Sequence, residues 1–237
     1  RHPATVHGVF QGHAPWLHFA RCLKRTLGYP IGLIPCALGG SPIALWQPGA
    51  KLFDNLVDMV RRSGGTVKGV VWHQGESDAF SKKSAAYPDG FRAMVKGLRA
   101  VLAHPDLPFI TGQLALWTSA PDPEAHLEFV RMREHQRQLA RELAHEVVPL
   151  LDLPIGDEVH LTAHANLEMG RRYAETALGT VYGRAVRMPG IVLVRTEVLG
   201  GTGVILRLVF KLGSPGWVKV GDPMGDFSVE DGRGEVP

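Results

Sequence analysis

The sequence predicts an α/β fold in which a parallel sheet is covered by helices on both faces and is followed by a small β module. Short apolar segments alternate with longer amphipathic ones over most of the chain, and after about residue 188 only short, β-rich segments separated by Gly and Pro remain. Strands that alternate with helices at such lengths are typical of a covered parallel sheet. We therefore expect one domain over residues 1–188 and an antiparallel β module over residues 189–237, cut short at Pro237.

Composition excludes several functional classes. Of the 237 residues, 45% are hydrophobic, which is enough for a full core, and no apolar run approaches the ~18 residues of a membrane-spanning helix. The net charge of +3 comes from 26 basic and 23 acidic residues that are spread along the chain without a basic block. We therefore expect neither a membrane nor a nucleic acid as a partner.

The helices are predicted by the spacing of apolar residues. Residues 15–28 place apolar side chains at helical spacing, with Pro at the start and Gly at the end. Further helices are expected over residues 52–62, 85–102, 125–145 and 163–180.

The strands are predicted by short apolar runs that end at glycines or polar clusters, which is typical of buried parallel strands. In the first domain they are expected over residues 31–38, 67–72, 109–116 and 147–153. In the β module they are expected over residues 191–195, 204–210, 217–220 and 227–229.

Two polar stretches are candidates for chemistry. The strand predicted over residues 67–72 ends in His-Gln-Gly-Glu-Ser-Asp at residues 73–78, and ligands of parallel sheets bind just beyond the carboxyl ends of the strands. Later, Asp157 and His160 stand three residues apart ahead of the last helix of the domain. A histidine in such a place can act as a general base, and the aspartate can orient its ring. We expect folding to bring both stretches to a shared crevice.

These stretches resemble a known family. The segments WHQGESDA (residues 72–79), DEVHLT (157–162) and LGGSPI (38–43) resemble the sialate O-acetylesterase and acetylxylan esterase branch of the SGNH (GDSL-like) hydrolases, over about residues 12–180. The resemblance implies a three-layer α/β/α, flavodoxin-like sheet. It also implies an acetylated small-molecule or polysaccharide carbohydrate as the substrate, no cofactor, and a secreted or periplasmic location.

The resemblance also implies catalytic roles. His160 would shuttle protons, and either Asp157 or Glu76 would support it, because some family members use the glutamate of the strand-end motif. Transition-state oxyanions need hydrogen-bond donors, and the expected donors are the backbone amide of Gly40 and the side-chain amide of Gln74.

Three further residues are candidates for the site. Ser77 stands where related branches carry an oxyanion-binding Asn, which departs from the pattern. Trp46 and Trp117 each follow a predicted strand end, where an indole ring can stack on a sugar.

The nucleophile of the resemblance is missing. The family serine ends the first strand, ahead of every segment above, and residues 1–14 hold no serine. We expect this first strand and its serine to lie upstream of Arg1, so that the domain is N-terminally incomplete. Within the chain, Ser77 lies in a Gly-x-Ser-x-Ala segment that approximates a nucleophile elbow, but Pro88 and residues 80–83 predict a delayed helix where an elbow needs one to start. Ser41 is a weaker candidate.

Two other patterns have competing interpretations. Among the 11 histidines only His160 and His164 have helical ligand spacing, and no Glu-rich or Cys-rich set of partners accompanies them, so no metal site is expected. Residues 133–136 follow an Arg-Glu-x-Gln pattern that similar helices of the family carry near the pocket, although a solvated helix face fits equally.

The sequence thus predicts a serine-type carboxylic ester hydrolase that removes acetyl groups from sugar hydroxyls. The competing hypothesis is a catalytically dead member of the family that lacks the serine and binds carbohydrate or serves a structural role.

Overall fold

The computed structural model describes residues 14–185, 191–199, 205–212, 229–231 and 234–236. Contacts divide the chain into two compact units, Arg1–Pro189 and Gly190–Pro237, which we describe separately. Among the described helices, none is both long and apolar enough to cross a lipid bilayer.

The first unit is organised around a three-stranded parallel sheet with the order β1-β2-β3. Its strands are β1 (Val70–Trp72), β2 (Phe109–Gly112) and β3 (Glu146–Val148). In register, Val71 lies opposite Ile110 and Thr111 lies opposite Val147. The strands predicted at these places are confirmed but shorter: β1 begins three residues later than predicted, and β2 and β3 end earlier than predicted.

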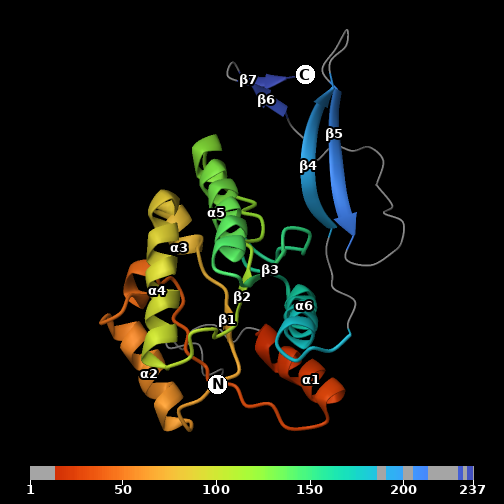
Figure 1. Ribbon diagram of the computed structural model, residues 1–237. Coiled ribbons are helices and arrows are strands. Elements are labelled where there is room, and N and C mark those ends of the chain that lie inside the picture. Colours follow the sequence, from red (N-terminus) through yellow and green to blue (C-terminus); the bar gives the residue numbers. More distant parts are fainter. Residues whose placement is uncertain (1–13, 186–190, 200–204, 213–228, 232–233, 237) are drawn as a thin grey trace. The chain divides into compact units, whose positions relative to one another are not determined.

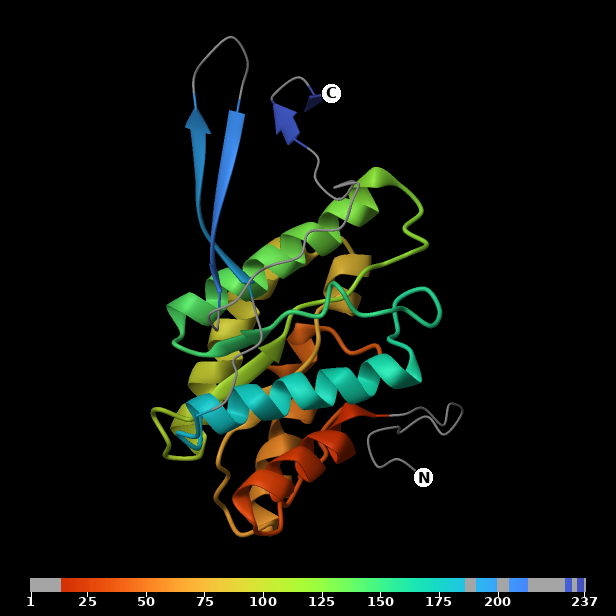
Figure 2. The same cartoon turned by 90° about the vertical axis from the view of Figure 1, so that its right-hand side faces the viewer.

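Helices cover both faces of this sheet, which makes three layers (Figures 1 and 2). On one face, α1 (Pro15–Leu27) and α6 (Ala163–Thr180) pack over Ile110 and Val148. On the other face, α2 (Lys51–Arg62), α4 (Tyr87–Val101) and α5 (Pro123–Glu142) pack over Trp72 and Phe109. The five helices predicted from apolar spacing are confirmed, and so are the three layers.

The strand predicted over residues 31–38 is not formed. These residues pair with no strand of the described part of the chain, and the Leu33 side chain is 41% exposed. Within the described sheet β1 pairs only with β2, and residues 31–38 form no ladder with either side of the sheet. Residues 1–13, for which no first strand is predicted, lie outside the described residues.

A short helix, α3 (Glu76–Phe80), begins where the sequence predicts a delay. Gly75 makes the sharp turn ahead of it with a φ of 144°, a conformation that favours glycine. A Cβ on Gly75 would also lie 3.1 Å from Met132 and from the Gln136 amide of α5, so the close approach needs glycine as well. Helix α3 thus begins one residue before Ser77, and the predicted delay of the helix is wrong.

Two 3-10 turns complete the first unit. The turn η1 (Ile43–Trp46) precedes α2, and η2 (Ser84–Ala86) leads into α4.

The second unit contains antiparallel strands. β4 (Ile191–Leu199) pairs with β5 (Ile205–Leu212), and β6 (Val229–Asp231) pairs with β7 (Gly234–Val236). The strands predicted over residues 191–195 and 204–210 are confirmed and are longer. Of the strand predicted over 227–229, Val229 is described and lies in β6, whereas β7 was not predicted. Residues 217–220 and 227–228 lie outside the described part.

His145 is a buried histidine between α5 and β3. Its side chain is 8% exposed, its ring packs 5.4 Å from that of Phe91, and neither ring nitrogen contacts a polar partner among the described residues. Burial, assisted by the nearby charge of Arg99, lowers the pKa of His145 from 6.5 to about 4.

This burial predicts a loss of stability in acid. Between pH 6.5 and about 4 the unfolded chain binds a proton on His145 that the folded chain does not, so the free energy of unfolding falls over this window, by about 2–3 kcal/mol. Urea unfolding at pH 7, 5.5 and 4.5 measures the slope. The variant His145→Leu is expected to flatten it, and an unchanged slope in this variant would show that other groups cause the loss.

Candidate active site

The most complete catalytic arrangement is an Asp–His pair in the loop between β3 and α6. The Oδ2 atom of Asp157 lies 2.6 Å from Nδ1 of His160, and Oδ1 accepts the backbone N–H groups of Val159 and His160, both at 2.8 Å. These two backbone hydrogen bonds, followed by the one to the imidazole, lower the pKa of Asp157 well below its usual range. Asp157 is therefore a fixed anion.

Local hydrogen bonds shape the loop that holds this pair. The Gly156 N–H donates to the His160 carbonyl at 2.7 Å, and the Thr162 N–H donates to the Pro154 carbonyl at 3.0 Å. The Thr162 side chain then caps α6 by accepting from the Ala165 N–H at 3.1 Å. Asp157 and His160 are thus held together by a tight turn that leads directly into the helix.

The pair leaves one nitrogen of His160 free for chemistry. A carboxylate at Nδ1 holds the proton on that nitrogen, so Nε2 is left to accept one. The His160 side chain is 81% exposed, and no hydroxyl of the described residues hydrogen-bonds to it. Of the two acidic residues that were expected to support His160, it is Asp157 that contacts it.

Glu76 forms a second histidine–carboxylate pair. Its Oε1 atom lies 3.3 Å from Nε2 of His73, at the end of β1, with both side chains largely buried. Burial alone would raise the pKa of Glu76, but the charge and the hydrogen bond of His73 outweigh it, and the charge of His160 adds to them, so that the pKa is lowered. Glu76 is therefore held as an anion close enough to His160 to sense its charge.

The segment after β2 connects the two candidate stretches. The Thr118 N–H donates to the Glu158 carbonyl at 2.9 Å, and its hydroxyl donates to the carbonyls of Asp157 and Glu158 at 3.2 and 3.1 Å. The neighbouring ring of Trp117 packs 4.7 Å from that of Phe80 on α3. The strand-end motif and the His160 loop therefore lie at the same end of the sheet.

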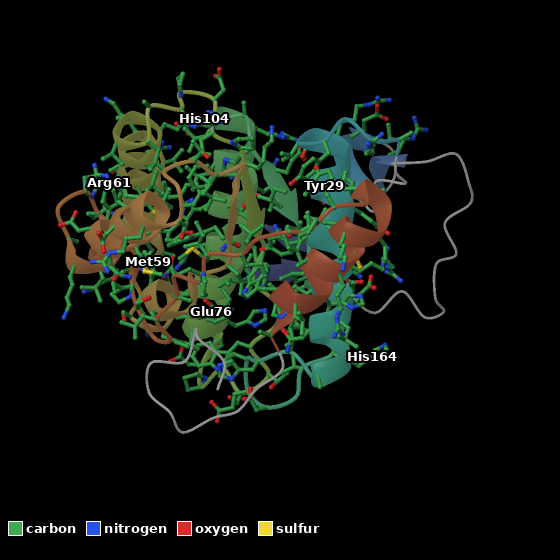
Figure 3. The ribbon with its side chains drawn as sticks, turned by 90° about the horizontal axis from the view of Figure 1, so that it is seen from below. Tyr29, Met59, Arg61, Glu76, His104 and His164 are labelled. Carbon is green, nitrogen blue, oxygen red and sulfur yellow. The ribbon has the colours of Figure 1, made fainter. Side chains whose placement is uncertain are left out.

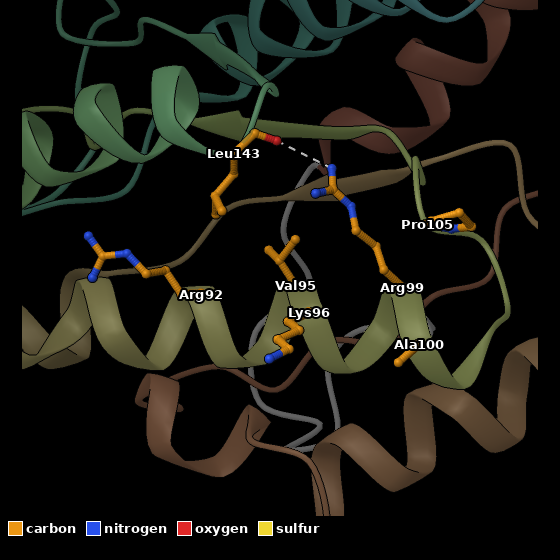
Figure 4. Close-up of a pocket in the computed structure, with 7 residues that line it drawn as sticks. All are labelled: Arg92, Val95, Lys96, Arg99, Ala100, Pro105 and Leu143. Atoms are coloured by element: carbon orange, nitrogen blue, oxygen red, sulfur yellow. Dashed lines mark hydrogen bonds between the residues drawn. The ribbon is translucent and has the colours of Figure 1, made fainter.

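In Figure 3 Glu76 and the α6 residue His164 lie toward one edge of the molecule, and His104 lies at the opposite edge. A pocket of about 490 Å³ lies at that opposite, amino-terminal end of the strands (Figure 4). It is lined by Arg92, Val95, Lys96, Arg99, Ala100, Pro105 and Leu143. It is therefore separate from the candidate site.

The Gln74 side chain holds the strand-end segment together. Its amide nitrogen donates to Oδ2 of Asp78 at 2.6 Å and to the Ser41 carbonyl at 3.1 Å. The same Asp78 oxygen accepts the Ile43 N–H at 3.0 Å. Since both amide hydrogens are used, a Gln74 that donates to an oxyanion would first have to give up one of these bonds.

The backbone N–H of Gly40 makes no hydrogen bond among the described residues. Gly40 turns the chain with a φ of 69° and is exposed. The next residue, Ser41, is 5% exposed, with its hydroxyl donating to the Leu38 carbonyl at 2.7 Å and accepting from the Trp46 indole at 2.9 Å. Ser41 is therefore not a free nucleophile, whereas the Ser77 hydroxyl makes no hydrogen bond within the described part.

The two tryptophans have different environments. Trp46 is 4% exposed and its ring packs edge-to-face on Trp72 at 5.1 Å, so its expected role in sugar stacking is wrong. Trp117 is partly exposed and packs against Phe129 at 5.2 Å and against Phe80, which is 43% exposed. Phe80 and Trp117 thus form an exposed aromatic pair beside the His160 loop, and the sequence had not indicated Phe80.

The side-chain amide of Gln136 on α5 is buried, which the sequence had left open. The Gln136 Nε2 atom donates to the Gln74 carbonyl at 3.1 Å, and its Oε1 atom accepts the Leu114 N–H at 3.0 Å. One side chain, 3% exposed, therefore joins the carboxyl ends of β1 and β2. The sequence left two interpretations of residues 133–136, a pattern beside the pocket and a solvated helix face. In the structure Arg133 and Gln136 are buried, whereas Glu134 lies on the outer face and pairs with Arg137.

Tyr173 was missed entirely. Its hydroxyl, on α6, donates to the Trp72 carbonyl at 2.8 Å and is fully buried. No local pattern signals such a contact, because the two residues are 101 positions apart.

Within the described part of the chain, no group of three or more His, Cys, Asp or Glu residues is arranged to hold a metal ion. The arrangement instead offers a polarised histidine, a fixed carboxylate and a free backbone N–H at one end of a parallel sheet, which are the parts of an acyl-transfer site.

Comparison with known families agrees with this geometry. A family model described as "Carbohydrate esterase, sialic acid-specific acetylesterase" matches residues 2–179. The chain belongs to this family. The predicted family resemblance is therefore confirmed.

Individual relatives in and near this esterase family share the fold. A probable carbohydrate esterase of Arabidopsis thaliana is 34% identical in an alignment 180 residues long that covers 72% of this chain and 65% of that protein. Sialate O-acetylesterase of Homo sapiens is 33% identical in an alignment 118 residues long that covers 39% of this chain and 22% of that protein. The solved structure of a carbohydrate acetylesterase from Xanthomonas citri superposes with a TM-score of 0.72 at 27% identity, covering 83% of this chain and 46% of that one. The chain thus spans slightly under two thirds of the plant relative's length.

Proposed function

We propose that this domain hydrolyses acetyl esters on carbohydrate hydroxyls by serine acyl-enzyme chemistry. The observation that carries the proposal is the 2.6 Å contact between Asp157 and His160 at the carboxyl end of the sheet. The family match and the names of the relatives, which include a carbohydrate esterase and a sialate O-acetylesterase, support an acetylated sugar as the substrate.

The proposed reaction uses His160 twice. Nε2 takes the proton of the nucleophilic hydroxyl as its oxygen attacks the acetyl carbonyl, and the Asp157 carboxylate stabilises the imidazolium that forms. When the ester bond breaks, His160 returns the proton to the departing sugar oxygen. In the second half His160 takes a proton from water, which attacks the acetyl-enzyme, and returns it to the serine oxygen as acetate leaves. No cofactor takes part.

The Gly40 N–H is the donor we propose for the oxyanion of both tetrahedral intermediates, because it is exposed and uncommitted. For the nucleophile we retain the serine expected upstream of Arg1, with Ser77 as the candidate within the chain.

Acetate release by the full-length protein tests the proposal. O-acetylated N-acetylneuraminic acid and acetylated xylan are incubated in parallel, and we expect acetate from at least one of them. A folded protein that releases none from either would refute the esterase and favour the non-catalytic carbohydrate-binding or structural protein.

Substitution of Asp157 by Asn tests the role of the pair. The Asn oxygen can still accept the N–H groups of Val159 and His160, but its NH2 group cannot accept the Nδ1 proton of His160. The ring is then expected to adopt the other tautomer, with Nε2 protonated, and kcat is expected to fall by about 10²–10⁴-fold.

The matched control is Glu158→Gln, which changes the exposed neighbouring carboxylate and leaves the backbone contacts of the loop in place. Equal losses of kcat in Asp157→Asn and Glu158→Gln would show that net charge, and not the contact with His160, is responsible.

A further inference from the structure

Arg133 on α5 is a buried cation that has no carboxylate partner among the described residues. Its side chain is 9% exposed, and its one described hydrogen bond runs from Nη1 to the Ala115 carbonyl at 3.2 Å. Burial lowers the pKa of this guanidinium, and no nearby acid among the described residues offsets the effect. Burying an unpaired charge costs stability, so such a charge calls for another explanation.

Several other arginines on α4, α5 and α6 are paired with carboxylates although they are more exposed. Arg131 contacts Glu124 and Glu128, and Arg137 contacts Glu134. On α6 and α4, Arg171, Arg172 and Arg92 likewise contact acidic side chains. Carboxylates are therefore plentiful on this surface, yet Glu134, adjacent to Arg133 in sequence, pairs with Arg137 on the outer face.

The guanidinium of Arg133 retains donors that a ligand can reach. A guanidinium carries five N–H donors in a planar fork, and one described hydrogen bond leaves the others unused. The Arg133 nitrogens that make no described hydrogen bond are not fully buried, so their N–H donors reach solvent. A planar fork of this kind matches a carboxylate through two parallel hydrogen bonds.

Arg133 also lies beside the candidate site. Arg133 donates to the carbonyl of Ala115, and the hydroxyl of Thr118 donates to the carbonyl of Asp157. Ala115 and Thr118 are three residues apart, a span of at most about 11 Å. One helical turn before Arg133, the Phe129 ring packs 5.2 Å from that of Trp117. Arg133 therefore lies one turn along α5 from Phe129, the ring against which the exposed aromatic pair packs.

We propose that Arg133 binds the carboxylate of an acidic acetylated sugar and makes the site selective for acidic over neutral carbohydrates. The inference rests on the proposed function and adds the charge of its substrate. A sialic acid and a uronic acid both present this carboxylate on a sugar ring, and that ring has the aromatic pair of Phe80 and Trp117 to pack against.

A matched pair of substrates isolates the carboxylate. The full-length protein is assayed with 9-O-acetyl-N-acetylneuraminic acid and with its methyl ester, which differ only in that charge. The wild type is expected to prefer the acid, and Arg133→Met is expected to reduce the acid-to-ester ratio of kcat/KM by about 10–100-fold, mainly through KM. Arg133→Lys is expected to lie between them, because it keeps the charge and loses the fork.

The control is Arg137→Gln, one turn further along α5, which removes an exposed cation and should leave the ratio unchanged. A wild type that hydrolyses acid and methyl ester equally, or an Arg133→Met that keeps the preference, overturns the proposal. An acetylated galacturonic acid forms a third arm: a preference for it over the sialic acid keeps the role of Arg133 and assigns the carboxylate to a uronic acid.

If the protein releases no acetate at all, the proposed esterase function is refuted, but binding of the carboxylate by Arg133 can still be tested. Calorimetric titration with N-acetylneuraminic acid, galacturonic acid and their methyl esters should then show binding of at least one free acid that Arg133→Met loses at least tenfold. Equal binding by wild type and variant, or no binding of either acid, overturns the inference.

Thermal unfolding separates this role from a structural one. Removing a buried charge without a carboxylate partner should leave the Tm of Arg133→Met equal to or above that of the wild type. A large fall in Tm together with equal losses on acid and ester would assign Arg133 to the fold and overturn the proposal.

Discussion

Replacing His160 by alanine is expected to lower kcat for acetyl-ester hydrolysis by about 10²–10⁴-fold with little change in KM. The side chain is 81% exposed and contacts only Asp157 among the described residues, so its loss removes the proton acceptor and leaves the core intact. Initial rates of acetate release by the full-length protein, over a range of substrate concentrations, measure the effect.

The matched control is His164→Ala. His164 is an exposed histidine on the first turn of α6, four residues beyond His160, and it makes no described side-chain hydrogen bond. It should retain the wild-type rate. If His160→Ala keeps kcat within about threefold of the wild type while its Tm is unchanged, His160 is not the base and the proposed mechanism is wrong.

Replacing Gly170 by alanine is expected to lower the free energy of unfolding by about 2–3 kcal/mol. Gly170 lies where α6 crosses α1, and an added Cβ would overlap the Pro15 carbonyl oxygen and lie 3.1 Å from the Phe19 backbone nitrogen. Because these are backbone atoms, they cannot rotate away, and α1 must shift. Alanine gains about 1 kcal/mol of helix propensity over glycine, which offsets only part of this cost.

Urea unfolding of Gly170→Ala measures this loss, and Gly32→Ala provides the control. A Cβ on Gly32 meets no atom within 4 Å and its φ is not in the left-handed region, so this variant should be within about 0.5 kcal/mol of the wild type. Equal stabilities of the two variants would mean that α1 and α6 are not packed as closely as the structure shows.

Short-range patterns predicted most elements of the first unit. The bounds of α6 follow from apolar spacing and from the Thr162 cap, both of which lie within the segment itself. The strand at residues 31–38 shows the limit of this reasoning, because an apolar run forms a ladder only when a neighbouring strand lies beside it. Helix α3 shows another limit, since the turn at Gly75 depends on the surface of α5 against which it packs.

The candidate site divides in the same way. Asp157 and His160 are three residues apart, so a single tight loop brings them together and their pairing was predictable. Glu76 was an equal candidate from the sequence, and only the folded chain shows that it contacts His73. Trp46 was predicted to stack on a sugar, whereas its ring is packed on Trp72.

By itself, the sequence determined the family and the layered α/β architecture, and it placed Asp157 three residues from His160, because motifs, periodicity and spacing are local properties of the chain. Only the tertiary structure decided that Gln74 is committed to Asp78 and Ser41, that Gln136 joins two strand ends, and that Arg133 is buried without an acidic partner among the described residues. These features depend on contacts between segments tens of residues apart, and burial and charge pairing are properties of such contacts.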